Sequence, residues 1–144
     1  MLPFYQQELS TSCVAACVRM ALGYDFSEPE IRSRCGHTKA GMRLNQIKSC
    51  LADLPLTVEY HIDWNPDDLK NAIRKSIFPI AGIDLRPIEG QFAFHAVVVS
   101  KISRDYIVVL DPLYKKGNRK IGMAAFEAGW INAEREAVTI TVLT

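Results

Sequence analysis

Hydrophobic and polar positions divide the chain into a first half with helical periodicity and a second half rich in strand patterns. The first apolar run, residues 14–22, is interrupted only by Arg19 and is followed by Gly23. An apolar surface on nearly all sides is typical of a buried helix, and glycine is a common helix stop. Thr11 or Ser12 is a suitable N-cap for this helix. The pattern therefore predicts a buried helix at the start of the chain.

Capping residues and apolar spacing predict three further helices. Ser27 is followed by a proline and two acids, which is typical of a helix start, and this helix should run to Gly36. Residues 44–51 have apolar side chains at helical spacing, and Pro55 ends that region. Asn65 begins another capped helix that should continue to about residue 76.

Alternating or β-branched stretches predict strands, most of them in the second half. A short helix near residues 126–130 interrupts them, and residues 103–105 form a polar turn. Helices followed by an antiparallel sheet are the α+β pattern, which we expect as one domain over residues 1–144. The expected strands are residues 56–62, 78–85, 92–102, 106–110 and 138–142.

Composition excludes several classes of partner. The 144 residues include 17 Lys and Arg and 16 Asp and Glu, giving a net charge of +1, so nothing favours binding to nucleic acid or an anionic membrane surface. No apolar stretch approaches transmembrane length, which predicts a protein that is not membrane-embedded. The N-terminus has no basic region followed by an apolar run, so we expect no signal peptide and a cytoplasmic location.

The four cysteines are expected to be reduced thiols in that compartment. Cys13 falls in the first turn of the predicted helix, where free N–H groups and the helix dipole lower a thiol pKa. Taken alone, it is as readily a small core residue. Cys17, Cys35 and Cys50 are expected to be buried or incidental thiols, because their spacing fits no usual zinc pattern.

Two residues in the sheet half are out of place among apolar neighbours. His95 interrupts an apolar strand, and Asp111 ends the next one. A hairpin centred on Ser103 would place them directly opposite each other, with Cβ atoms about 4.5–5.5 Å apart. A shift of the turn by one residue would make them diagonal neighbours. In the directly opposite arrangement, the Asp111 carboxylate is within reach of an imidazole nitrogen of His95.

These residues complete a set suited to nucleophilic catalysis. Cys13 would attack a carbonyl, His95 would take and return the proton, and Asp111 would orient the imidazole. Gln7, upstream of the helix, is placed to donate its amide to a developing oxyanion together with the Cys13 backbone N–H, and Gln6 competes for that role.

Three short motifs occur along the chain in a fixed order. They are Pro3-x-x-x-Gln7-x5-Cys13-x-x-Ala16, His95-x-Val97-Val98-Val99 and Val109-Leu110-Asp111-Pro112. In these motifs and in several landmarks between them, the chain resembles the bacteriocin-processing, double-glycine cysteine peptidases. The resemblance extends over almost all 144 residues.

The resemblance implies a papain-like peptidase fold, with the helical half packed on the sheet. It also implies that Cys13 is the nucleophile, His95 the base, Asp111 the orienting residue and Gln7 the oxyanion-hole residue. The implied reaction needs no cofactor and removes a leader from a peptide or protein substrate, typically after Gly-Gly. The implied partner is an ABC-type peptide exporter, here supplied separately.

Two features leave the function open at this stage. The family usually has glycine directly after the nucleophile, whereas this chain has Val14, which is expected to narrow the groove and alter the Gly-Gly preference. The same triad would also serve deamidation or acyl transfer, and an inactive relative would only bind peptide. The basic segment 115–120 is expected to be a solvated loop. The alternative is a loop that contacts the substrate, since the segment follows Asp111.

Overall fold

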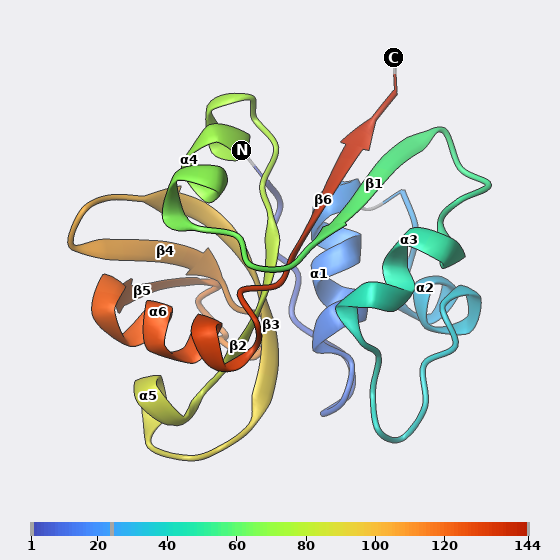
Figure 1. Ribbon diagram of the computed structural model, residues 1–144. Helices are drawn as coiled ribbons and strands as arrows, with labels where there is room; N and C mark the ends of the chain where they lie inside the picture. The colour runs from blue at the N-terminus through green and yellow to red at the C-terminus, as the bar shows by residue number, and fades with distance from the viewer. Residues whose placement is uncertain (1, 24, 144) are drawn as a thin grey trace.

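A six-stranded antiparallel sheet runs through the middle of the molecule (Figure 1). The structure is a computed structural model and describes residues 2–23 and 25–143. The strand order is β1-β6-β2-β3-β4-β5. The strands are β1 (Leu56–His61), β2 (Ile80–Asp84), β3 (Phe94–Ile102), β4 (Tyr106–Leu110), β5 (Asn118–Gly122) and β6 (Ala137–Val142).

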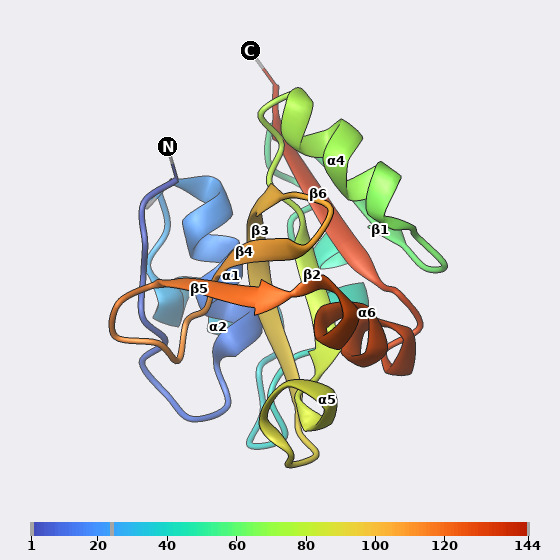
Figure 2. The ribbon, with the colours of Figure 1, turned by 90° about the vertical axis from the view of Figure 1, so that its left-hand side faces the viewer.

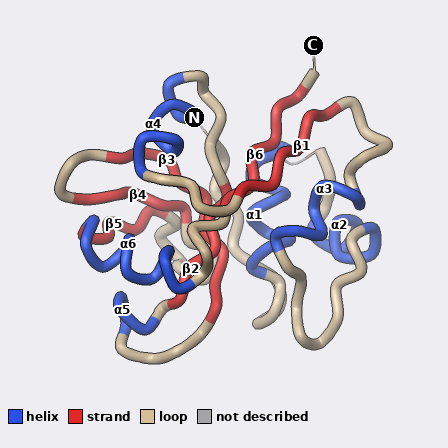
Figure 3. Tube along the Cα trace, viewed as in Figure 1, coloured by secondary structure: helices blue, strands red, loops and turns tan. Residues whose placement is uncertain are grey.

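Helices cover both faces of this sheet, as the colouring by secondary structure shows (Figure 3). On one face lie α1 (Cys13–Leu22), α2 (Glu28–Arg34), the 3₁₀ helix η1 (Leu44–Gln46) and α3 (Ile47–Cys50). On the other face lie α4 (Pro66–Arg74) and α6 (Met123–Asn132), and α5 (Arg86–Glu89) packs against α6. The arrangement confirms the expected α+β fold with a helical half packed on an antiparallel sheet.

Each face of the sheet has its own hydrophobic core. The core on the α1 side includes Val18 and Met20, both fully buried, against strand residues such as Val98. The core on the α6 side is built around Phe126 and Trp130, which are also fully buried. The first helix is therefore apolar on nearly all sides because the sheet and the other helices enclose it.

Local sequence determines where the helices begin and end. Ser27 caps α2 in a reciprocal capping box with Glu30, and Asn65 does the same for α4 with Asp68. Gly23 ends α1 with a φ of +71°, in the left-handed region that glycine adopts most easily. These predicted boundaries are confirmed to within a few residues.

The basic segment 115–120 matches its prediction as a solvated loop only in part, because Lys115 and Lys116 are exposed and outside any strand but the residues after Gly117 are not a loop. Residues 118–122 form β5, which pairs with β4 at the edge of the sheet. Only Arg119 and Ile121 are turned away from solvent in this strand. A strand with one apolar inward position has too little hydrophobic alternation to be recognised from sequence.

The cysteines also differ from the prediction that all four are reduced thiols. Cys35 and Cys50 form a disulfide, with Cα atoms 5.0 Å apart, whereas Cys13 and Cys17 are free. Cys35 lies at the end of α2 and Cys50 at the end of α3. Packing of these two helix ends brings the sulfurs together, which spacing along the chain cannot show.

The N-terminal segment runs beside the loop that joins β4 to β5 (Figure 2). The backbone N–H of Gln7 donates to the carbonyl of Pro112 at 2.9 Å. Phe4 packs so closely on Gly117 that any Cβ at that position would lie 2.7 Å from its ring. Within residues 2–23 and 25–143, no helix combines the length and apolar character needed to cross a bilayer.

Candidate active site

The start of α1 leaves its first backbone N–H groups available. Ser12 occupies the N-cap position, as predicted, but its side chain makes no capping hydrogen bond. Its hydroxyl instead accepts from the Leu9 N–H at 2.9 Å and donates to the Leu9 carbonyl at 3.0 Å. Helix N-termini with unpaired N–H groups favour negative charge. Cys13, the first residue of α1, is therefore placed where a thiolate is stabilised.

The Cys13 thiol is partly buried and hydrogen-bonds the His95 side chain. Burial raises the pKa of this thiol. The hydrogen bond and charge of His95, together with the backbone N–H groups of Ala96 and Val14, outweigh that effect and hold the Cys13 pKa below its usual range. The site therefore favours the thiolate, the nucleophilic form of cysteine.

His95 and Asp111 are in contact, although not in the register that a turn centred on Ser103 predicts. The β3–β4 register pairs Val98 with Leu110, and a bulge follows between Val99 and Lys101. Continuing this register places Asp111 opposite Val97, so His95 is its diagonal neighbour. His95 Nε2 lies 2.7 Å from Asp111 Oδ1, and both side chains are at least 95% buried.

The His95 ring is held in its charged form. Burial lowers the His95 pKa, but hydrogen bonds with Asp111 and Cys13, and their negative charges, raise it to about 9. Because Nε2 faces the carboxylate, Nδ1 is the ring nitrogen left to face the thiol. A thiolate–imidazolium pair is the protonation state that this arrangement favours at neutral pH.

Asp111 has further partners that the sequence did not reveal. Its Oδ2 accepts from Arg119 Nη1 at 3.0 Å, and its Oδ1 accepts from the Leu113 N–H at 2.9 Å. Arg119 also forms an ion pair with Glu89 of α5. Burial raises the Asp111 pKa, but the bonds with His95, Leu113 and Arg119 lower it below the usual range. The alternation of Arg119 with Ile121 was the only sequence feature that pointed to an inward side chain.

Gln7 lies beside this group on the N-terminal segment. Its backbone is tied to Pro112, the residue after Asp111. Its amide Nε2 donates to the Leu9 carbonyl at 2.7 Å, and its Oε1 is buried without a hydrogen-bond partner among the described residues. One amide hydrogen serves Leu9, and the second has no acceptor in the described part of the chain. The neighbouring Gln6 is exposed.

Val14 and Cys17 lie in the core, away from solvent. Val14 is only 6% exposed and packs in the core on the α1 side, so the expectation that it narrows the groove is corrected. Cys17 is fully buried, and desolvation raises its pKa well above the usual value. Of the two free cysteines, only Cys13 has the environment of a reactive thiol.

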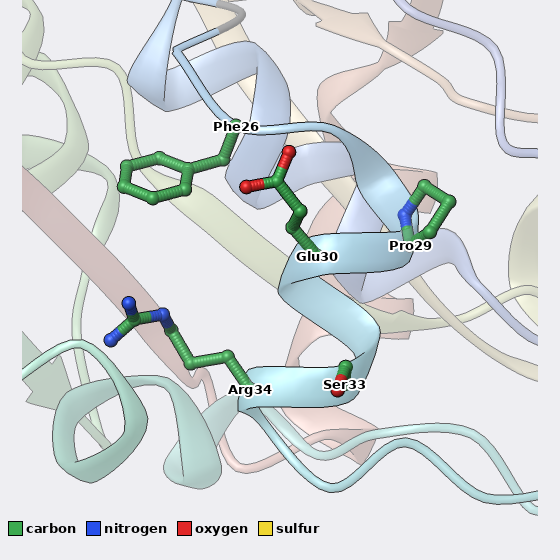
Figure 4. A pocket seen from close by; sticks show the side chains of 5 residues that line it. All are labelled: Phe26, Pro29, Glu30, Ser33 and Arg34. Carbon is green, nitrogen blue, oxygen red and sulfur yellow. The ribbon is translucent and has the colours of Figure 1, made fainter.

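A separate hollow lies on the outer side of α2 (Figure 4). It contains none of the predicted site residues, and its Arg34 is engaged with Asp53 at 2.7 Å. Its lining residues are Phe26, Pro29, Glu30, Ser33 and Arg34.

Comparisons with solved structures identify domains of the same fold. A double glycine motif protease from an AMS/PCAT transporter, solved with a leader peptide, has a TM-score of 0.75 at 19% identity, covering 99% of this chain and 92% of that one. A C39-like peptidase from Bacillus anthracis has a TM-score of 0.81 at 13% identity, covering 97% and 94%. The peptidase domain of Streptococcus ComA has a TM-score of 0.71 at 17% identity, covering 98% of each chain.

Sequence comparisons complete the assignment. No match is found among curated protein sequences. The sequence model of the peptidase C39 family, in contrast, matches residues 1–134, which is nearly the whole chain. With that match and the fold above, the chain belongs to the peptidase C39 family and is a cysteine peptidase.

Proposed function

We propose that this chain cleaves a peptide bond with Cys13 as nucleophile, His95 as general acid and base, and Asp111 as the orienting residue. The hydrogen-bonded chain from the Cys13 thiol through His95 to the buried Asp111 carboxylate is the observation that carries this proposal. Gln7 acts as the oxyanion-hole residue together with the Cys13 backbone N–H.

In the first half of the reaction, the Cys13 thiolate attacks the carbonyl carbon of the scissile bond. The carbonyl oxygen gains negative charge, which the Cys13 backbone N–H and the second Gln7 amide hydrogen stabilise. His95 then donates its Nδ1 proton to the leaving amine as the C–N bond breaks. A thioester on Cys13 and the free amine product result.

In the second half, water replaces the amine. Neutral His95 takes a proton from this water through Nδ1 as the water oxygen attacks the thioester carbon. The C–S bond breaks, the carboxylic acid product leaves, and the thiolate–imidazolium pair is restored. Asp111 holds the His95 ring in one orientation throughout, through its bond to Nε2.

We infer that the substrate is a peptide carrying a leader that ends in a small-residue pair. A solved protease of this fold, at 19% identity, is described as a double glycine motif protease in complex with a leader peptide, which supports this substrate class. Exposed apolar side chains beside the triad fit such a peptide: Phe94 precedes His95 and is 63% exposed, and Leu113 follows Asp111 by two residues and is 51% exposed.

An ABC-type peptide exporter is the partner we propose, with both proteins acting on the cytoplasmic side of the membrane. The likeness to the ComA peptidase domain, which belongs to a bifunctional ABC transporter, supports this context. The exporter would receive the peptide freed from its leader.

A mass-spectrometric cleavage screen tests the proposed function. Precursor peptides with Gly-Gly, Gly-Ala and unrelated leader ends are incubated with the protein, and we expect cleavage after the small-residue pair. Cys13→Ala and His95→Ala should each abolish cleavage, whereas Cys17→Ala, one turn further along α1, should retain it. Cleavage that survives Cys13→Ala, or no cleavage of any peptide, would overturn the proposal.

A further inference from the structure

Arg119 connects the proposed triad to the edge of the sheet. It lies on β5, and its side chain is only 13% exposed. Its Nη1 donates to Asp111 Oδ2 at 3.0 Å, on the side of the carboxylate away from His95. An arginine held this far from solvent pays for its desolvation only through the hydrogen bonds that it makes.

The two oxygens of Asp111 have different partners. Oδ1 accepts from His95 Nε2 and from the Leu113 N–H, and Oδ2 accepts from Arg119. Rotation of the carboxylate would break the bond to Arg119. The bond to Arg119 therefore fixes the plane in which Oδ1 meets the imidazole, because charge-assisted bonds are short and directional.

Arg119 is itself held from the outer side. Glu89 of α5 forms an ion pair with the same Nη1 atom, and the Tyr114 ring lies 4.9 Å from the guanidinium carbon. Glu89 is 42% exposed, and its carboxylate offsets part of the arginine charge. Because its charge is partly offset, Arg119 orients the carboxylate more than it opposes the charge on His95.

We propose that Arg119 is a positioning residue for the peptidase reaction, acting through Asp111 to hold His95 in its charged, productive orientation. This inference rests on the proposed function. The charged groups around Asp111 are His95 from β3 and Arg119 from β5, with Glu89 from α5 beyond Arg119 and the Cys13 thiol from α1 beyond His95.

The rate at which iodoacetamide alkylates Cys13 tests this role without any peptide substrate. The rate is measured from pH 5 to pH 10 on the intact protein, with the labelled cysteine located by mass spectrometry. In the unsubstituted protein, Cys13 should react rapidly at neutral pH, and Cys17 should not react. In Arg119→Met, the alkylation rate at neutral pH should fall about tenfold to a hundredfold, the range for a lost hydrogen bond to a charged group.

The pH limits distinguish positioning from a merely structural role. With Asp111 free to rotate, His95 is less stabilised as imidazolium, so the Cys13 thiol should keep its proton to higher pH and the acid limit of alkylation should move up. Arg119→Lys, which keeps the charge, should recover most of the range. Lys120→Met removes an equal charge from the next residue of β5, which lies over Tyr106, and should leave the profile unchanged.

The outcomes distinguish a failure of the positioning role from a failure of the proposed peptidase function. Slow labelling of Cys13 in the unsubstituted protein would overturn the proposed function itself. Rapid labelling there, with an unchanged or widened pH range in Arg119→Met, would overturn the positioning role alone. If Arg119→Met unfolds at a lower urea concentration, Glu89→Gln still decides. It removes the outer ion pair that holds Arg119, so a pH profile identical to that of the unsubstituted protein contradicts the inference.

Discussion

At the scale of single residues, the position of one proton links His95 to Cys13 and Asp111. The His95 pKa is raised to about 9 and the Cys13 pKa is lowered, so a range of pH exists in which both are charged. The two groups titrate as a coupled pair, and kinetics will report values that belong to the pair. Peptidase activity should therefore be confined between two pH limits instead of following the titration of one group.

We expect a bell-shaped dependence of kcat/KM on pH. The rate rises as Cys13 loses its proton and falls near pH 9 as His95 loses its own. In Asp111→Asn the His95 pKa should return toward about 6.5, the usual value, so the alkaline limit should move to lower pH. Rates of peptide cleavage from pH 5 to pH 10 measure both profiles. An alkaline limit that stays near pH 9 in Asp111→Asn would contradict this assignment.

Two adjacent glutamines allow a matched test of the oxyanion role. Gln7→Ala should lower kcat by about 10²–10³-fold, because one donor to the transition-state oxygen is lost. Gln6→Ala should leave kcat unchanged, since Gln6 is exposed. Alkylation of Cys13 should be normal in both variants, because the thiolate does not depend on the oxyanion donor. Equal kcat values in the two variants would exclude Gln7 from this role.

The candidate residues themselves could be predicted from the sequence, but their contacts only in part. Cys13, His95 and Asp111 differ in kind from the apolar residues around them, and this contrast makes them visible. The hairpin turn is centred about one residue later than Ser103, which places Asp111 opposite Val97 instead of His95, because the polar run 103–105 does not by itself fix where the turn is centred. Arg119 was assigned to a basic loop, since a charged run is indistinguishable from a solvated one without its partners.

At the scale of elements, the loop between α2 and α3 supports the residues that precede Cys13. His37 contacts the Thr11 side chain at 3.1 Å and its carbonyl at 3.2 Å. Gly41 lies so close that a Cβ there would be 3.0 Å from the Thr11 carbonyl oxygen, and its φ is +89°. The start of α1 therefore rests on a loop that requires glycine at this point.

A glycine pair tests this close contact. Gly41→Ala adds a clash to an unfavourable φ. Gly23 also has an unfavourable φ, +71°, but a Cβ there would meet no atom within 4 Å in the part of the chain that the structure describes. We expect Gly23→Ala to lower the free energy of unfolding by about 1 kcal/mol, and Gly41→Ala to lower it further and reduce kcat. Urea unfolding and peptide cleavage measure the two effects. Equal losses of stability with an unchanged kcat would show that Thr11 needs no such support.

The disulfide closes this same loop. Cys35 and Cys50 are 15 residues apart, and a loop of that length is restricted in the unfolded chain. Reduction should therefore lower the free energy of unfolding by about 3 kcal/mol, measured in urea with and without a phosphine reductant. The Cys35→Ser, Cys50→Ser double variant should be insensitive to the reductant. An equal effect of the reductant on the free energy of unfolding of both proteins would contradict a stabilising role for the disulfide.

The elements with strong local determinants were the ones predicted well. Capping boxes identified the starts of α2 and α4, because their hydrogen bonds form within four residues. The predicted helix over residues 44–51 is in fact η1 followed by α3, since apolar spacing alone does not distinguish 3₁₀ from α-helical turns. The edge strand β5 depends on pairing with β4, which no local pattern records.

At the scale of the whole molecule, the N-terminal segment joins the helical half to the sheet. Its Gln7 is tied to the β4–β5 loop through Pro112. One residue later, the Glu8 N–H donates to the carboxylate of Glu28 at 2.9 Å. Glu28 belongs to α2, is fully buried and also accepts from Arg32 at 3.1 Å. The proposed oxyanion donor is thus held between two anchors on opposite halves.

Removal of the Glu28 carboxylate, the anchor on the helical half, should displace Gln7 and leave Cys13, His95 and Asp111 in place. In Glu28→Ala the Glu8 N–H and Arg32 lose a buried acceptor, which should lower the free energy of unfolding by about 1–3 kcal/mol. We expect kcat to fall as well while Cys13 alkylation stays rapid, because His95 and Asp111 belong to the sheet half.

Two further variants separate the anchoring role from stability in general. Glu28→Gln keeps an acceptor for the Glu8 N–H, so its kcat should fall less than that of Glu28→Ala although the ion pair with Arg32 is lost. Ser33→Ala, at an exposed position of the same helix, should leave kcat unchanged. Urea unfolding and single-turnover cleavage measure all three proteins. If Glu28→Ala loses stability but keeps its full kcat, Gln7 is held by the Pro112 bond alone, and the helical half contributes to the site only through α1.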